Sequence, residues 1–217
     1  MSSITSTIES WASARRTTAA AILLLLAASL LAVAFAPILM LDSYSIIEHS
    51  VSESAAQGVE GAWMARVGFL CLGLGVLLCA QLAGSRWGLW GRAAHRLYGV
   101  SMLGAAAFSH RPWLDVPFDA TEDYLHSASA NAVGLGFTVG VLLVALRRGR
   151  GEVAARVFDW TAIAVAMGFS MLMFNVDGIA GLVQRIMFLI GYAWYGAEAV
   201  RSVVAPDEAR EVAAALP

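Results

Sequence analysis

The chain alternates between long apolar segments and shorter polar segments. Most of the apolar segments are clear by their length, whereas one, residues 94–109, is shorter and contains glycine. A helix needs about 20 apolar residues to cross a membrane, and no segment shows the period-two alternation of a barrel strand. The pattern therefore predicts six membrane-spanning helices, at residues 18–40, 63–83, 94–109, 124–146, 158–175 and 179–203.

Composition agrees with this interpretation. Of the 217 residues, 59% are hydrophobic and only 14% are charged, and the mean hydropathy is +0.70. Soluble domains are about 45–50% apolar and about 25% charged. The excess of apolar residues argues against a disordered chain, a nucleic-acid-binding protein and an ordinary cytosolic enzyme. We therefore predict an all-α integral membrane protein, a six-transmembrane helix bundle.

The placement of arginine predicts the orientation of the bundle. Arginines precede the first apolar segment and follow the second, fourth and sixth, whereas the loops on the other side are acidic. Basic loops stay on the cytoplasmic side of a membrane, so we expect both termini to be cytoplasmic and the protein to lie in the cell (plasma) membrane. The predicted organisation is a cytoplasmic tail at 1–17, a transmembrane domain at 18–203 and a second cytoplasmic tail at 204–217.

The first apolar segment also has features of a secretory signal. Arg15 and Arg16 precede it, and Ala34-Phe35-Ala36 fits a cleavage site. Its run of about 23 apolar residues is longer than a signal core and long enough to span a membrane. The length favours a first span that is retained.

Small residues recur at every fourth position in several segments, for example at Ala128, Ala132, Gly136 and Gly140. Such spacing lets helix backbones approach closely in lipid. We expect these faces to pack within the chain, with a homo-oligomer through the same faces as the alternative.

Polar residues gather in the predicted outer loops and at the outer ends of the spans. A charge near hydrocarbon is costly unless it is paired or faces a wet cavity. We predict an outer polar cleft formed by the first loop folding over the fourth and sixth spans, in which Glu53 accepts from Arg185 or Arg66 beside His126. Asp177 is a further candidate partner for Arg185, and the cleft would suit an anionic group. The candidate ligand-binding residues are Ser52, Glu53, Arg66, Asp119, His126, Asp177, Gln184 and Arg185.

Three of the four histidines fall on the predicted outer side. His49, His110 and His126, with a carboxylate such as Asp119, are residue types that hold tetrahedral zinc. No H-E-x-x-H, H-x-x-x-H or C-x-x-C spacing accompanies them. The sequence therefore favours hydrogen-bonded histidines over a metal site, and we predict no cofactor. His95 lies among cytoplasmic arginines and is expected to be an interface residue.

Several short motifs resemble those of the uncharacterised family catalogued as domain of unknown function 998. They are Tyr44-Ser45, Val51-Ser52-Glu53 with Ala55 and Gly58, the stretch GFLCLGLGVLL, Pro117-Phe118-Asp119 followed by His126, and Gly181-Leu182-Val183-Gln184-Arg185. The resemblance covers about residues 20–203. It departs at Ser54 and Ala55, which replace Leu-Gly, and at residues 109–113. The resemblance implies a six-helix bacterial or archaeal membrane protein and carries no established activity.

Three functions remain open from the sequence. The first is a non-catalytic membrane protein that binds a lipid or a membrane-protein partner at the outer cleft. The second is a membrane-embedded enzyme that modifies or hydrolyses a lipid with His126 and Asp119, with or without a metal. The third is a small transporter, although the chain lacks the internal repeat and midplane charges expected of one.

Overall fold

The computed structural model describes residues 2–204, and every regular element in that range is helical. Three short 3-10 helices connect or follow the α-helices: η1 (Ala36–Leu39), η2 (Glu53–Ala55) and η3 (Gly84–Trp87). The α-helices are α1 (Ser2–Phe35), α2 (Ala62–Ala83), α3 (Gly88–Ala107), α4 (Ala120–Arg147), α5 (Val153–Asn175) and α6 (Ala180–Val204).

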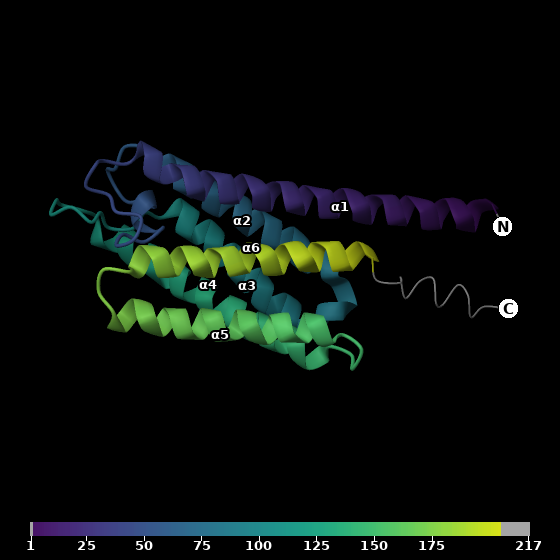
Figure 1. Ribbon diagram of the computed structural model, residues 1–217. Coiled ribbons are helices and arrows are strands. Elements are labelled where there is room, and N and C mark those ends of the chain that lie inside the picture. Colours follow the sequence, from purple (N-terminus) through teal and green to yellow (C-terminus); the bar gives the residue numbers. More distant parts are fainter. Residues whose placement is uncertain (1, 205–217) are drawn as a thin grey trace.

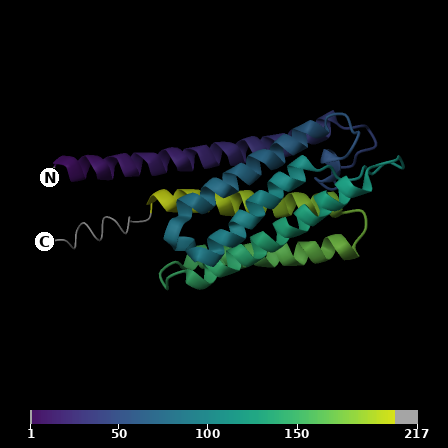
Figure 2. The ribbon, with the colours of Figure 1, turned by 180° about the vertical axis from the view of Figure 1, so that it is seen from behind.

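The six α-helices form one bundle in which each helix packs against the next in sequence (Figure 1). The bundle closes because α6 returns to pack against both α1 and α2, and the view from behind shows the same arrangement (Figure 2). Three connections, residues 40–61, 108–119 and 176–179, lie together at one end, here called the loop end. The other end carries η3 and residues 148–152 and is called the arginine end.

Four helical stretches are long and apolar enough to cross a membrane: Ser10–Leu39, Ala62–Ala107, Ala120–Arg147 and Val153–Met173. The second stretch contains two helices, because the chain reverses at η3. Gly84 and Gly88 have φ values of +56° and +65° at this turn, a region that L side chains rarely adopt. The prediction of an all-helical chain is therefore confirmed for the described residues, which include helices long and apolar enough to cross a membrane. The number of six spans stays a prediction.

The first helix begins before the first apolar segment. Helix α1 begins at Ser2, so the stretch predicted as a separate tail continues the first span as one helix. It projects beyond the other helices at the arginine end (Figure 1). The predicted C-terminal tail, 204–217, lies outside the described residues apart from Val204.

Small residues permit the closest helix contacts. A Cβ atom on Gly136 of α4 would lie 2.9 Å from the backbone oxygen of Ala94 in α3, so only glycine allows this approach. Gly140 is likewise buried, whereas Ala128 of the same stripe is exposed. The part of this row of small residues at Gly136 and Gly140 thus packs within the chain, as predicted. A homo-oligomer through the same faces stays a prediction.

A polar contact ties α1 to two other helices. The Ser29 hydroxyl of α1 donates to the carbonyl oxygen of Gly68 in α2 at 2.6 Å. It also shares a hydrogen bond of 2.8 Å with the Tyr192 hydroxyl of α6. Because hydrogen bonds between helices hold a bundle together where lipid provides no hydrophobic driving force, this contact fixes α1 against the rest of the fold.

Candidate functional site

The first loop, residues 40–61, is docked onto the start of α6. The Gln184 side chain accepts hydrogen bonds through Oε1 from the backbone nitrogens of Val51 at 2.6 Å and Ser52 at 3.3 Å. The backbone nitrogen of Leu182 donates to the Ile47 carbonyl at 3.0 Å. The predicted docking of this loop onto the sixth helix is therefore present, through atoms that the sequence did not indicate.

Arg185 holds the same loop by its backbone. Its guanidinium donates to the carbonyl oxygens of Ile46 at 2.8 Å and His49 at 3.1 Å, and to the Tyr44 hydroxyl at 2.8 Å. Burial raises the pKa of Tyr44, against the opposing effect of Arg185. The phenol thus keeps its proton and donates it to the Ser50 carbonyl at 2.9 Å.

Glu53 does not reach the arginines predicted for it. Its carboxylate accepts from the backbone nitrogen of Ser50, and its own backbone nitrogen donates to the Ser50 hydroxyl at 3.1 Å. This reciprocal pair closes a turn inside the loop, and Glu53 forms no ion pair with Arg66 or Arg185 within the described residues. The predicted Glu53 contacts are wrong because a local turn supplies its partner.

Three other predicted site residues do not make the contacts that the sequence predicted. Of these, Asp119 also contacts the first loop, since its backbone nitrogen donates to Oε1 of Gln57 at 2.7 Å. Arg66 of α2 pairs with Glu122 of α4 at 3.3 Å, a partner that was not among its candidates. Asp119 caps α4 by accepting from the backbone nitrogens of Thr121 and Glu122. Asp177 is exposed in the turn before α6 and, in the part of the chain described, makes no pair with Arg185, so that predicted pair does not form.

The histidines divide between two places. His49 packs against Trp113 with ring centroids 5.3 Å apart, and its Nδ1 accepts from the backbone nitrogen of Ser45 at 2.8 Å. His126 is fully buried, contacts His110 edge-on at 5.3 Å and donates from Nδ1 to the Phe108 carbonyl at 2.9 Å. No group of three His, Cys, Asp or Glu in residues 2–204 is arranged to hold a metal.

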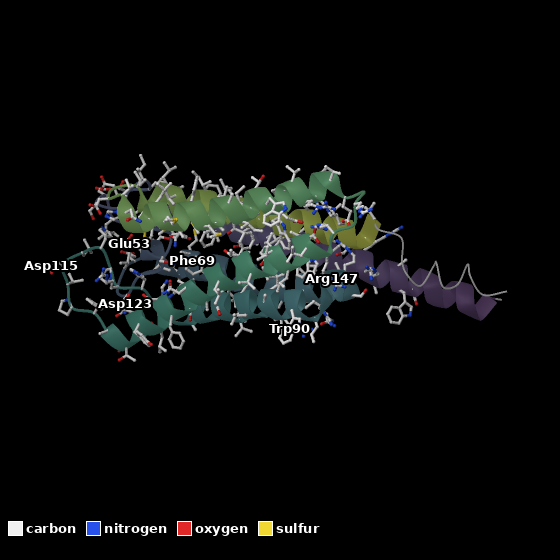
Figure 3. The ribbon with its side chains drawn as sticks, turned by 90° about the horizontal axis from the view of Figure 1, so that it is seen from below. Glu53, Phe69, Trp90, Asp115, Asp123 and Arg147 are labelled. Atoms are coloured by element: carbon white, nitrogen blue, oxygen red, sulfur yellow. The ribbon has the colours of Figure 1, made fainter. Side chains whose placement is uncertain are left out.

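A cavity of about 580 Å³ lies between α4, α5 and α6, with α2 and α3 behind it. We call it the α4–α6 cavity. Phe69, which Figure 3 places inside the bundle, is part of its wall. Its remaining aromatic wall comes from Tyr98, Phe137 and Phe188. Its methionines are Met102, Met167, Met171, Met173 and Met187. Its other polar positions are Ser52, Asn131, Thr138, Ser170 and Gln184.

Two of the predicted site residues, Ser52 and Gln184, line this cavity at the loop end. His126 sits behind its wall, with its ring 6.4 Å from that of Phe69, and does not line it. The cavity itself could not be found from the sequence, because its walls come from five helices and one loop. Asn131 of α4, one turn beyond the serine-rich start of the helix, is the clearest sequence signal that points to it.

The sequence model of a family described as protein of unknown function (DUF998) matches residues 19–201. The chain belongs to the DUF998 family. The resemblance predicted from the short motifs is thereby confirmed. Comparison of this DUF998 protein with curated proteins and with solved structures finds no match.

The motifs that carry the family resemblance meet one another in this DUF998 protein. Tyr44 of the first motif contacts Arg185 of the last, and Ser52 of the second contacts Gln184. Sequence stretches more than 130 residues apart thus build one structure, the docked loop over the end of the cavity. These motifs therefore have a structural role in holding the first loop, and by themselves they indicate no catalytic activity.

Sequence reasoning missed a buried charge cluster at the arginine end. Arg148 binds Asp159 of α5 through Nε at 2.8 Å and Glu198 of α6 at 2.7 Å. The indole nitrogens of Trp194 and Trp87 donate to Asp159 and Glu198, each at 2.8 Å. Both carboxylates are fully buried. The sequence signal for this cluster was the presence of two acidic residues, Asp159 and Glu198, in otherwise apolar segments.

The Arg148 guanidinium stays charged in this cluster. Burial lowers its pKa, but the hydrogen bond to Asp159 and the charge of Glu198 outweigh that effect and raise the pKa above its ordinary value. Arg86 adds a bond to Glu198 at 3.0 Å. The cluster therefore fastens the ends of α4, α5 and α6 to η3.

His95 is not the interface residue that the sequence predicted. It is fully buried, stacks on Trp194 with centroids 4.9 Å apart, and shares a hydrogen bond of 2.9 Å with the Tyr195 hydroxyl. The prediction rested on the arginines that flank His95 in the sequence. In the structure, the aromatic rings of η3 and α6 enclose its side chain.

Proposed function

We propose that this chain is a six-span protein of the plasma membrane, with both termini in the cytoplasm, that binds a lipid in the α4–α6 cavity without catalysing a reaction on it. The observation that carries the proposal is the cavity itself. Binding pockets commonly have volumes of about 300–1,000 Å³ and apolar walls with few polar groups, and this cavity of about 580 Å³ has both properties.

The distribution of charge supports the proposed orientation. Figure 3 shows Glu53, Asp115 and Asp123 at the loop end, and Trp90 and Arg147 toward the other. Arg86, Arg148 and Arg150 also belong to connections at the arginine end. Since positively charged loops stay in the cytoplasm, the arginine end faces the cytoplasm and the loop end faces outward.

The position of the cavity supports a lipid as its occupant. Leu135 and Val139 of α4 and Met167 and Met171 of α5 line it and are exposed. In a membrane these side chains face hydrocarbon, so an acyl chain reaches the cavity sideways between α4 and α5. Methionine is flexible and fills irregular space, which suits a chain that is not rigid.

Two glycines provide a direct test. Gly191 lines the cavity, and a Cβ atom added to it would meet no atom within 4 Å. Gly168 of α5 has the same open surroundings and does not line the cavity. Gly191→Leu therefore fills the cavity, and Gly168→Leu is its matched control.

We expect Gly191→Leu to weaken binding of a fluorescent fatty alcohol by at least about tenfold, roughly 1.4 kcal/mol, in anisotropy titrations of the full chain in detergent. Gly168→Leu should bind like the wild type. Neither change should lower the melting temperature, because leucine favours helix more than glycine by up to ~1 kcal/mol. Wild-type affinity in Gly191→Leu would rule out this cavity as the lipid site.

A further inference from the structure

The loop end of the α4–α6 cavity is polar but carries no formal charge. Ser52 and Gln184 supply its polar side chains there, and Asn131 lines the cavity further along, near the middle of α4. No Asp, Glu, Arg or His is among the described residues that line any part of the cavity. An ionised headgroup at this place would lose water without gaining an opposite charge, which is strongly unfavourable in a low-dielectric site.

The nearest arginines have other partners. Arg185 follows Gln184 in sequence, but its guanidinium donates to the carbonyl oxygens of Ile46 and His49 and to the Tyr44 hydroxyl. Arg66 pairs with Glu122. The anionic ligand that the sequence predicted for this end would therefore have to break contacts that hold the first loop.

The orientation of the Gln184 amide determines which head atoms it recognises. Its Oε1 accepts from the backbone nitrogens of Val51 and Ser52, which fixes which side of the amide is oxygen. Its Nε2 makes no hydrogen bond within the described residues, and the amide lines the cavity. An amide nitrogen only donates, so this edge selects a head with an oxygen that accepts.

We propose that the ligand is an uncharged lipid whose head accepts a hydrogen bond through an ester carbonyl or hydroxyl oxygen. The head lies at Gln184 beneath the docked loop, and the apolar tail lies among the methionines of the α4–α6 cavity. This inference rests on the proposed function, because it assigns the ligand class of the same cavity. The Nε2 of Gln184 donates to the head oxygen, and no charge is left unpaired.

The test compares two lipids that share their acyl chains. Dioleoylglycerol has a neutral head, whereas dioleoylphosphatidic acid carries a phosphate on the same glycerol. Binding of each to the full chain in detergent is measured by native mass spectrometry across a lipid titration. We expect the neutral lipid to bind at least about tenfold more tightly, because the phosphate finds no cation in the cavity.

A single substitution tests the role of the Gln184 donor. Gln184→Glu keeps an oxygen that accepts from Val51 and Ser52 but replaces the donating nitrogen by a second carboxylate oxygen. Dioleoylglycerol binding should then fall by about tenfold or more, measured on protein that a melting curve shows to be folded. Gln81→Glu is the matched control, since Gln81 is exposed and accepts from Arg96 through Oε1 at the arginine end.

The outcomes separate the two proposals. Absence of binding by either lipid to the folded protein would overturn the proposed function. Equal binding of both lipids, or tighter binding of the phosphatidic acid, would overturn the neutral-head inference and leave the lipid function standing. Unchanged dioleoylglycerol binding in Gln184→Glu would remove Gln184 as the head donor.

Discussion

Single residues decide how charge is placed in this bundle. Arg148 stands between Asp159 and Glu198, both fully buried, and every contact among the three is a charge-assisted hydrogen bond. Such bonds are shorter and stronger than neutral ones. A buried ion pair adds little net stability to a protein. Removal of one partner is nevertheless strongly destabilising, because the other charge is then buried without a partner.

Replacement of Arg148 should therefore destabilise the protein strongly. Arg148→Met leaves two buried carboxylates without their common cation, and we expect a loss of about 3–5 kcal/mol, read as a lower melting temperature in detergent. The triple variant Arg148→Met, Asp159→Asn, Glu198→Gln should recover a large part of that loss, because neither buried side chain then carries a charge. Arg86 and Arg201 also lose Glu198 as a partner, but their side chains are partly exposed and stay hydrated. A triple variant less stable than the single one would show that the cluster contributes more than mutual neutralisation.

The partners of these charged residues could not be predicted from the sequence. Arg148 and Glu198 are 50 positions apart, and nothing local links them. Arg66 was predicted to pair with Glu53, yet it pairs with Glu122 at the start of α4. Pairing of charges depends on helix rotation and packing, which a single sequence does not encode in any short pattern.

At the scale of elements, close backbone contact fixes the first loop on α6. A Cβ atom on Gly181 would collide with the carbonyl oxygens of His49 and Ile46. Those oxygens belong to the peptide backbone and also accept from Arg185. The loop therefore has little room to shift, and Gly181 is required by its neighbours rather than by its own conformation.

Gly181→Ala should weaken this contact. We expect a loss of about 1–3 kcal/mol of stability from overpacking and faster proteolysis within residues 40–61. Gly168→Ala, which meets no atom within 4 Å, should instead leave stability unchanged or raise it by up to ~1 kcal/mol. Equal protease resistance of the two variants would mean that the loop is not held at Gly181.

Prediction from the sequence was most accurate for the number and approximate positions of the helices. Each of the six apolar segments corresponds to one of the helices α1 through α6. Four helical stretches, which cover α1 to α5, are long and apolar enough to cross a membrane. Helix α1 begins before its apolar segment, because the more polar residues from Ser2 to Thr17 continue the same helix. The docking of the first loop was expected, although Gln184 rather than Glu53 provides it.

At the scale of the whole molecule, the bundle separates two environments along its length. The loop end has acidic connections and the cavity's polar side chains, whereas the arginine end has the buried charge cluster and the projecting part of α1 (Figure 1). The aromatic layer of His95, Trp87 and Trp194 lies between cavity and cluster. The proposed ligand site at one end and the charge cluster at the other are therefore physically separate.

The orientation of these two ends in the membrane is a prediction that labelling can decide. Ala120 is exposed at the start of α4, and Arg150 lies in the connection between α4 and α5 at the opposite end. In a background with Cys71→Ala and Cys79→Ala, Ala120→Cys should react with a membrane-impermeant maleimide in intact cells. Arg150→Cys should react only after lysis, since basic loops are retained in the cytoplasm. The reverse pattern would place the docked loop and the mouth of the cavity toward the cytoplasm, and the lipid would then reach the protein from the inner leaflet.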